Sequence, residues 1–535
     1  MLILTAGAEP QASPVRKADA ACARCHAKIM RTYLSSPMAN ASGLASERLI
    51  PGAYSHKASQ VDYSVGRVGG LPMLTVRSAH NSGWQDAQPL SYFLGSGHLG
   101  LTYLYFVRDY LFESPVAWYA APGKYDMKPG FAGLPSMPPA IPMQSACLRC
   151  HMSGVVETIP GTINRYQDLP FVSTGITCES CHGDSNAHVR AGGKAAIVNP
   201  GRLGAEERDS VCISCHLEGD VTVERAGRSA LNYEPGHSIS TYLAYYVRGG
   251  SNLTARGVSE VEQLSQSVCK RTSGDRMSCT SCHDPHFTPS REQRTAFYRE
   301  KCLACHAETN FAAQHHPENP DCTSCHMPRS GAENIPHVAW TDHRILRVPE
   351  SPEPAGAAVA AKPSTELRPI FSPGATQRDL AMAEYKLMLD GDREFGAPAL
   401  KSLLAIKGSI WNDDAALDAL GSLSAGRGDF SEAGQDFRRV LALDPNDVTA
   451  LSNLGVMLAK QGKTLEGVEL LRRAFDRNED LPGLAMNLAR TECLAGDSAS
   501  ASKTLEEALV FSPGFEELEH LLDGMKDCRA YRGGQ

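Results

Sequence analysis

Seven copies of the pattern Cys-x-x-Cys-His run through the 535 residues of this chain. Chance would give about 0.02 such matches for a chain with this many cysteines and histidines, so the repetition has a chemical cause. Fourteen of the 17 cysteines belong to the pattern. The seven copies are Cys22/Cys25/His26, Cys147/Cys150/His151, Cys178/Cys181/His182, Cys212/Cys215/His216, Cys279/Cys282/His283, Cys302/Cys305/His306 and Cys322/Cys325/His326.

The pattern is typical of covalent haem attachment. Its two thiols can each form a thioether with a haem vinyl group, and the adjacent histidine is then held under the ring as the proximal iron ligand. Paired cysteines also build zinc ribbons, but a zinc site does not require a histidine after every second cysteine. The motifs therefore predict seven covalently bound haem c groups, each with one proximal histidine.

Haem c is attached outside the cytoplasm, so we expect an exported, periplasmic or otherwise extracytoplasmic protein. Residues 1–16 include "LILTAGA", which is similar to the end of a signal peptide; the alternative is a disordered natural N-terminus. The net charge of −8 comes without a basic cluster, which argues against nucleic acid as a partner. No apolar run is long enough for a transmembrane span, so any membrane association would be peripheral, through partners.

An electron-transfer haem needs a second axial ligand, usually histidine, whereas an open position favours substrate chemistry. Eleven histidines lie outside the motifs. His286 follows His283 so closely that it cannot easily reach the other face of the same haem, so we expect it to serve a neighbouring one. The favoured distal ligands are His188, His286, His337 and His343, followed tentatively by His56, His237 and His316.

Four of the six gaps between successive motifs are only 20 to 34 residues long. Such short segments cannot each build a separate core, so we expect the haems to form the core, packed against one another and against short helices and loops. Closely packed haems would conduct electrons along the chain.

Segments such as "GITCESCHGDSNAH", "MSCTSCHDPHFTP" and "IPHVAWTDHRI" resemble the multihaem cytochromes c related to hydroxylamine oxidoreductase and cytochrome c nitrite reductase, and more closely a bacterial group that fuses such a cytochrome to tetratricopeptide repeats. The resemblance spans residues 17–346 and the repeats that follow. It implies an extracytoplasmic electron-transfer protein. The lysine-ligated Cys-x-x-Cys-Lys motif of the nitrite reductases is absent. The tyrosine cross-link of hydroxylamine oxidoreductases has candidates in Tyr233 and Tyr298 but no sequence support.

Many of these relatives have Ser-x-His-Ala after the first motif, with that histidine as a distal ligand. This chain has "SSPMA", so the resemblance implies that Met38 takes the histidine's place, which would give a haem of higher potential. The alternative is that Met38 packs against a haem edge while His56 or His98 binds that iron.

The sequence pattern of residues 52–125 differs from that of the haem-motif segments. "VDYSVGRVGGLPMLTVRS" and "LTYLYFVRDYLFES" predict two hairpins, and hence a small β-rich insert. "GSGHLG", residues 95–100, matches a dinucleotide-binding fingerprint, but a strand-like run follows it where that fingerprint needs a helix, so we interpret it as a loop.

The C-terminal part repeats with a period of 34 residues, which is the tetratricopeptide signature. We expect a Pro/Ala-rich linker over 347–376, a helical solenoid over 377–526 and a short tail over 527–535. Such a solenoid would dock a protein partner or, alternatively, stabilise the cytochrome. Cys493 and Cys528 lie at equivalent points of adjacent repeats and could form a disulfide.

The fold class predicted is mainly α with a small β-rich insert: a haem-packed cytochrome followed by an α-solenoid. The function predicted is electron transfer along mainly bis-histidine haems to redox partner proteins, with no catalytic residue assigned. The alternatives are a periplasmic reductase or oxidase for a small nitrogen or sulfur compound at one open haem, and a scaffold in which the haems are a passive relay.

Overall fold

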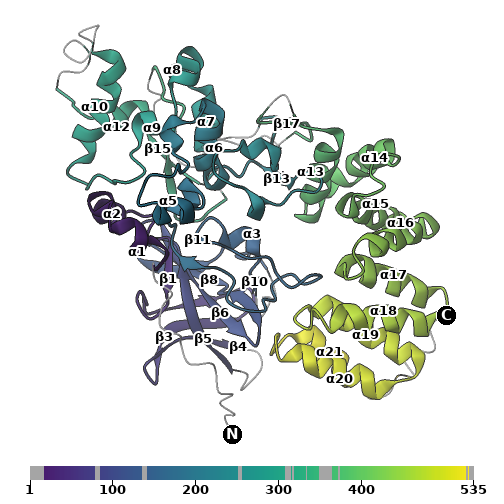
Figure 1. The fold of residues 1–535 in the computed structure, drawn as a ribbon. Coiled ribbons are helices and arrows are strands. Elements are labelled where there is room, and N and C mark those ends of the chain that lie inside the picture. The colour runs from purple at the N-terminus through teal and green to yellow at the C-terminus, as the bar shows by residue number, and fades with distance from the viewer. Residues whose placement is uncertain are drawn as a thin grey trace.

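The computed structural model describes residues 17–78, 85–134, 141–250, 256–307, 315, 318–332, 334–348, 364–371, 374–525 and 528. The expected signal-peptide remnant, residues 1–16, and the candidate ligand His316 lie outside the described residues. Two halves are visible: one with a β-sheet below loops and short helices, and an arc of helices beside it (Figure 1). None of the described helices is long and apolar enough to cross a membrane.

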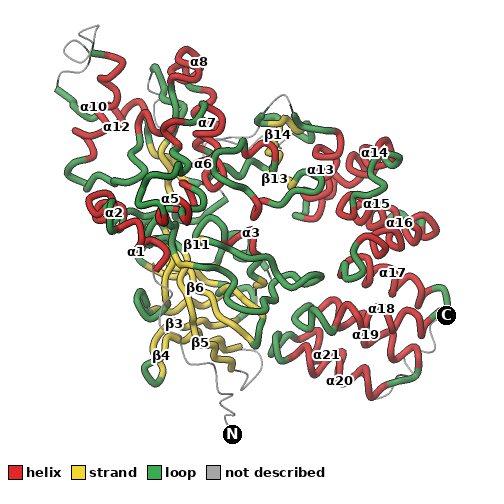
Figure 2. Tube along the Cα trace, in the orientation of Figure 1, coloured by secondary structure: helices red, strands yellow, loops and turns green. Residues whose placement is uncertain are grey.

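A ten-stranded sheet, antiparallel throughout, forms the lower part of the first half (Figure 2). Both predicted hairpins are present, one turning at Gly69–Gly70 and the other at Arg108–Asp109. The two turn glycines have φ values of 58° and 87°, which suit a tight hairpin. The strands are β1 (Ser42–Leu44), β2 (Gly52–His56), β3 (Val61–Val68), β4 (Leu71–Ser78), β5 (Gln85–Leu94), β6 (Gly100–Val107), β7 (Tyr110–Glu113), β8 (Val116–Tyr119), β9 (Lys124–Met127) and β10 (Ile141–Pro142).

The prediction of a small β-rich insert was wrong in scale, because the region is a substantial β structure with its own core. Tyr63, Tyr103, Tyr105, Tyr110 and Phe112 are all buried in it. Strands on both sides of the two predicted hairpins extend the sheet to ten strands. "GSGHLG" is the loop between β5 and β6, as its sequence context indicates.

Short helices and small sheets above the β-sheet contain the haem motifs. The helices are α1 (Lys17–Ala23), α2 (Ala27–Tyr33), α3 (Ser145–Leu148), α4 (Glu179–His182), α5 (Asn186–Arg190), α6 (Ala205–His216), α7 (Glu260–Gln266), α8 (Val268–Ser273), α9 (Cys279–Cys282), α10 (Arg294–His306) and α12 (Cys322–His326). The strands are β11 (Met152–Ser153), β12 (Ser173–Thr174), β13 (Val221–Glu224), β14 (Leu243–Arg248), β15 (Arg329–Gly331), β16 (Ala339–Thr341) and β17 (Leu367–Pro369).

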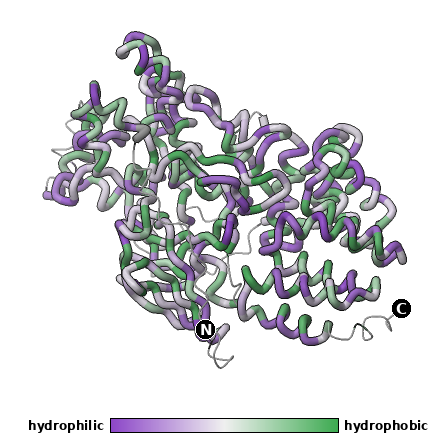
Figure 3. Tube along the Cα trace, turned by 60° about the horizontal axis from the view of Figure 1, so that its bottom comes forward, coloured by the Kyte–Doolittle hydropathy of each residue, from purple (hydrophilic) through white to green (hydrophobic). Residues whose placement is uncertain are grey.

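The arc consists of antiparallel helix pairs. Apolar and polar residues alternate along these helices, so each pair buries one face against the next (Figure 3). Gly467 marks a helix crossing: a Cβ there would lie 2.6 Å from the carbonyl oxygen of Gly455, so only glycine permits this approach. The helices are α13 (Gln377–Leu389), α14 (Gly396–Ile406), α15 (Asp414–Gly426), α16 (Phe430–Leu443), α17 (Val448–Lys460), α18 (Thr464–Phe475), α19 (Pro482–Ala495), α20 (Ser498–Leu509) and α21 (Glu516–Met525).

The first helix of the arc is bound directly to the haem-motif half. Arg225 forms an ion pair of 2.8 Å with Asp379 on α13, and Lys386 donates to the carbonyl of Thr222 at 2.7 Å. Part of the segment expected to be a linker, β17, pairs with β14 and extends that small sheet to three strands. The connection is therefore partly structured, although residues 349–363 lie outside the described part of the chain.

A disulfide joins the buried Cys493 on α19 to Cys528 after α21, with a Cα–Cα distance of 5.2 Å. It closes a loop with a sequence separation of 35 residues around the end of the solenoid. A bond of this kind fits an oxidising compartment.

We expect Cys528→Ser to destabilise the end of the solenoid by about 2 to 4 kcal/mol, since cross-linking a loop of this length removes that much chain entropy from the unfolded state. Urea unfolding followed by far-ultraviolet circular dichroism measures the change. Dithiothreitol should lower the urea midpoint of unfolding of the wild type and leave that of the variant unchanged. Equal changes in both midpoints would contradict a structural disulfide.

Candidate haem-binding site

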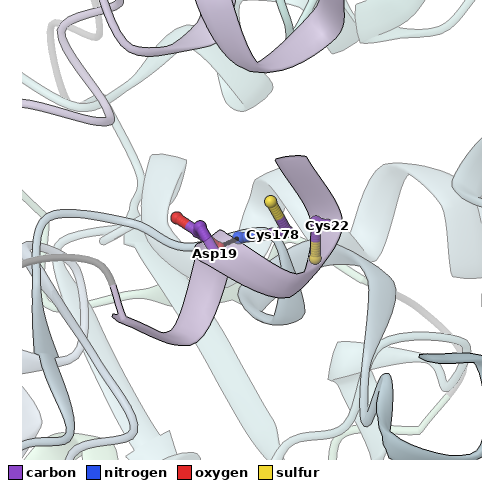
Figure 4. Close-up of side chains that lie close together, drawn as sticks. All are labelled: Asp19, Cys22 and Cys178. Atoms are coloured by element: carbon purple, nitrogen blue, oxygen red, sulfur yellow. Dashed lines mark hydrogen bonds between the residues drawn. The ribbon is translucent and has the colours of Figure 1, made fainter. Parts of the chain in front are cut away.

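The first and third motifs lie side by side although 150 residues separate them. The amide of Cys178 donates to the buried carboxylate of Asp19 at 3.0 Å, and the Tyr33 hydroxyl donates to the carbonyl of Ile176 at 2.7 Å. Asp19, Cys22 and Cys178 place their ligand atoms within 4.8 Å of one another (Figure 4). Both sulfurs are predicted attachment atoms of haem motifs, so two predicted attachment points are adjacent here.

Four motif histidines face a second histidine ring. Two imidazoles that bind one metal ion from opposite sides have ring centres about 6 Å apart, since each metal–nitrogen bond is about 2 Å. Each observed pair fits an iron between its rings. The pairs and their centroid distances are His26–His188 at 6.5 Å, His182–His286 at 6.0 Å, His283–His343 at 6.3 Å and His326–His315 at 5.7 Å.

Backbone carbonyls orient several of these rings. The Nδ1 atom lies 2.8 Å from the carbonyl of Val198 in His182 and 2.8 Å from that of Ala195 in His188. An Nδ1–H bonded in this way leaves the lone pair on Nε2, which is the usual arrangement of a metal-binding histidine. His326 and His343 are held in the same way, by the carbonyls of Leu346 and Thr341.

Two of these rings, His283 and His286, lie where the neutral imidazole is favoured. Burial, and then repulsion from His343, lowers the pKa of His283 to about 4. Burial, and then His182, lowers the pKa of His286. A metal binds the neutral form of histidine, so these environments suit iron ligation.

Cysteines of different motifs are neighbours in an ordered series. Cys22 of the first motif adjoins Cys178 of the third, and Cys181 adjoins Cys212 and Cys215 of the fourth. The series continues through Cys212–Cys279, Cys282–Cys305 and Cys302–Cys322 to the seventh motif. The second motif branches from the fourth through Cys150–Cys215.

Three of the predicted attachment cysteines, Cys25, Cys147 and Cys325, are not part of this series. Cys25 and Cys325 contact residues of their own motifs. The Cys25 amide donates to the carbonyl of Cys22 at 3.2 Å, and Cys325 Sγ lies 3.8 Å from Ser324 Oγ. Cys25 and Cys147 are exposed and Cys325 is half-buried. All fourteen motif cysteines are free of disulfides, so each thiol is available for a thioether, and their attachment to haem stays a prediction.

Buried polar atoms around the second and fourth motifs have no hydrogen-bond partner of good geometry among the residues that the structure describes. These are Arg149 Nε, His151 Nδ1, Tyr233 Oη and Tyr245 Oη. Arg149 also donates to the carbonyl of Ser214 in the fourth motif. A buried polar atom without a partner is costly, and each haem brings two propionate groups that can accept hydrogen bonds. The donors from Arg149 and the tyrosines therefore fit bound haem.

The segment with the last three motifs has almost no apolar core of its own. Among the described residues of 256–348, Pro289 and Val338 are the two apolar side chains of the aliphatic or aromatic kind that are buried. Helices α9, α10 and α12 bury none of their residues. A chain this long needs buried apolar surface to fold, and haem macrocycles would supply it.

Some predicted ligands lie elsewhere. His337 directs Nε2 at Asp126 of β9, 2.7 Å away. His56 lies in β2 with Nδ1 2.7 Å from Ser59 Oγ and Nε2 3.0 Å from the carbonyl of Ala132, so neither nitrogen is available to iron. The His237 side chain is 61 % exposed, with Glu234 3.9 Å away.

Met38 is half-buried, and its carbonyl accepts the amide of Ile176 at 3.1 Å. The ring that faces the first proximal histidine belongs to His188, and the ligand role of Met38 stays a prediction.

His315 was missed by the sequence reasoning. It adjoins His316 in the sequence, and the doublet alone gives no means of deciding which ring turns toward His326.

Three family models match the chain, in an order that follows this architecture. "Cytochrome c554 and c-prime" matches residues 136–183, "Doubled CXXCH motif" matches 272–311, and "Tetratricopeptide repeat" matches 448–481. The chain is a multihaem c-type cytochrome fused to tetratricopeptide repeats. It contains covalently bound haem c as its cofactor.

Curated relatives match only part of this cytochrome. Multiheme cytochrome MtrA of Shewanella baltica is 26% identical over 180 residues, 30% of this chain and 52% of the relative. Dissimilatory sulfite reductase MccA of Wolinella succinogenes is 23% identical over 197 residues, 32% of this chain and 25% of the relative. The chain thus spans about half or less of each relative's length.

Solved tetratricopeptide proteins resemble the repeats alone. MamA from Desulfovibrio magneticus RS-1 is 19% identical, covering 29% of this chain and 90% of that structure, with a TM-score of 0.26. TTC0263, a protein of Thermus thermophilus, is 18% identical, covering 28% and 79%, with a TM-score of 0.23. Scores this low support no argument about shape.

We expect His188→Ala to convert one haem from low spin to high spin, because the ring facing His26 is removed. Electron paramagnetic resonance of the oxidised, haem-loaded protein measures this. His337→Ala is the matched control and should leave the wild-type spectrum unchanged, since that ring faces Asp126. A high-spin signal from the control but not from His188→Ala would reverse the assignment.

Proposed function

We propose that this protein is an extracytoplasmic electron carrier that passes electrons along seven haem c groups. The ordered contacts between cysteines of different motifs support this most directly. They define a path from the first motif through the third, fourth, fifth and sixth to the seventh, with the second as a branch at the fourth.

The proposed ligation is mainly bis-histidine. His188, His286, His343 and His315 serve the first, third, fifth and seventh haems, opposite the proximal histidines that they face. Three of the four, His188, His286 and His343, come from a segment that follows a later motif, whereas His315 lies just before the seventh motif that it serves. This interlocking fixes the spacing between haems and keeps the reorganisation of each iron small. The haem itself supplies the redox chemistry, a one-electron change at iron.

The repeats are proposed to dock a redox partner protein. The groove between α16 and α17 is a cavity of about 270 Å³, with Leu454, Met457 and Leu458 among its lining. Arg438 also lines it and has no ion pair among the described residues, its one hydrogen bond being to Gly434 in its own helix. An apolar partner segment with an acidic side chain complements this groove.

For the first haem we propose that Met38 packs beside the third motif. The oxidised protein should then show no absorption band at about 695 nm, the region in which methionine-ligated haem c absorbs. Met38→Leu should leave the visible spectrum and the reduction potentials unchanged. A band in the wild type that disappears in this variant would restore the methionine-ligand hypothesis.

A second candidate function is reduction or oxidation of a small nitrogen or sulfur compound at an open haem. It is favoured by the second and fourth motifs, because no second histidine ring faces His151 or His216 among the residues that the structure describes. Arg149, Tyr233 and Tyr245 place hydrogen-bond donors beside them, which suits an oxyanion. The relative named as a sulfite reductase matches the same class of chemistry.

Spin state and ligand binding separate the two functions. A pure electron carrier should be low spin throughout, and cyanide, nitrite and sulfite should leave its spectrum unchanged. A haem count from intact mass should give seven additions. A high-spin signal that responds to one of these anions would favour the enzyme, and fewer than seven additions would contradict the proposed relay.

A further inference from the structure

A buried carboxylate lies between the predicted attachment points of the first and third haems. Asp19, on α1, is 2 % exposed and accepts the amide of Cys178 at 3.0 Å. One of its oxygens and the sulfurs of Cys22 and Cys178 lie within 4.8 Å of one another (Figure 4). Each sulfur is where a thioether would join the edge of a haem, so the first and third haems would share this carboxylate as a neighbour.

No lysine or arginine whose side chain the structure describes forms an ion pair with Asp19. Its bond to Cys178 comes from an uncharged main-chain amide. The other buried carboxylates among the described residues before the solenoid are each paired with a cation, so Asp19 differs from them in carrying an unbalanced charge. These pairs are Glu113–Lys128, Glu262–Arg256 and Asp342–Arg344.

The charge of Asp19 acts on both attachment sulfurs. Burial raises the pKa of the Cys22 thiol, and the charges of Asp19 and Glu179 raise it further. Burial likewise raises the pKa of the Cys178 thiol, followed by a hydrogen bond to Asp19 and by its charge. The basic side chain inside the first motif, Arg24, is exposed, so water and salt screen it. The electrostatic environment of this junction is therefore acidic.

A buried negative charge beside a haem favours the oxidised iron, which carries one more positive charge than the reduced iron. The effect is strong in the protein interior, where little water screens it. We infer that Asp19 lowers the reduction potentials of the first and third haems together and so makes them the electron-entry end of the relay. This inference rests on the proposed function, because it assumes that electrons pass along the haems.

The junction of the second and fourth motifs has a different charge. Arg149 donates to the carbonyl of Ser214 there, and its charge offsets that of the neighbouring Glu218. The haems at that junction therefore do not face an unbalanced acid as the first and third do. Electrons move spontaneously from haems of lower potential to haems of higher potential, so they would run from the first and third haems toward the second and fourth.

A reductive titration of the full, haem-loaded chain tests this inference, with haem absorption measured against the applied potential. Asp19→Asn should make the two haems of lowest potential easier to reduce. The ratio of reduced to oxidised haem at a fixed potential should rise about tenfold for these two, which is about 59 mV for a one-electron couple. The asparagine oxygen can still accept the amide of Cys178, so the substitution removes the charge and keeps the hydrogen bond.

Three further variants separate charge from structure. Asp19→Glu keeps the charge and should titrate like the wild type. Glu179→Gln removes the second acid near Cys22 and should raise the same low-potential part of the curve by less than Asp19→Asn does. Asp436→Asn is the matched control: this residue is a 5 % exposed carboxylate on α16, paired with Lys407 at 3.2 Å within the solenoid, and its loss should leave the curve unchanged.

Three results would overturn the inference. The first is an Asp19→Asn protein with seven haems that titrates like the wild type or at lower potential; if this variant does not receive all its haems, an unchanged curve for Glu179→Gln has the same meaning. The second is a shift confined to the haems of highest potential. The third is an Asp19→Glu curve that matches that of Asp19→Asn, which would show that geometry and not charge sets the potentials. Fewer than seven haems in the wild type, by intact mass, would instead contradict the proposed relay.

Discussion

Covalent attachment of haem is the constraint on which the motif-bearing part of this protein depends. Residues 256–348 contain two buried aliphatic or aromatic side chains among those described, Pro289 and Val338, yet three attachment motifs lie there. A polypeptide with so little apolar surface cannot offset its conformational entropy by itself. Attachment through two thioethers per haem places the missing apolar mass at fixed points, so the cofactor acts as structure as well as redox centre.

The β-sheet and the solenoid are built on the opposite principle. Each buries its own aromatic and aliphatic side chains, and each presents a firm edge to the haem segments. Arg225, paired with Asp379 on α13, shows how the solenoid holds a motif segment that is far away in sequence, and the Tyr33–Ile176 hydrogen bond joins two motif segments to each other. A haem array made of short loops gains its rigidity from such neighbours and from the cross-segment histidines.

Features set by neighbouring residues could be predicted from the sequence, whereas several contacts between residues far apart in the chain could not. The attachment residues follow from a five-residue pattern, and the period of 34 predicts the helix pairs. His286 was expected to serve a neighbouring haem, and its ring faces His182. His337 and His343 looked equivalent in "IPHVAWTDH", yet only His343 faces a proximal ring, because Asp126 from β9 approaches His337. The size of the sheet was missed because strands such as β1 and β10 are too short to give an alternating pattern.

The second motif branches from the fourth, and this branch bears on what the proposed relay can do. A linear relay needs contacts only between successive haems, so the contact of Cys150 with Cys215 has no role in simple conduction. Arg149 is held there by the carbonyl of Ser214, within the same motif pair, and a buried cation beside two haems favours their reduced, more electron-rich state. The second and fourth haems would therefore both hold electrons more firmly than the rest of the proposed relay, which gives it either a reservoir or a site of chemistry.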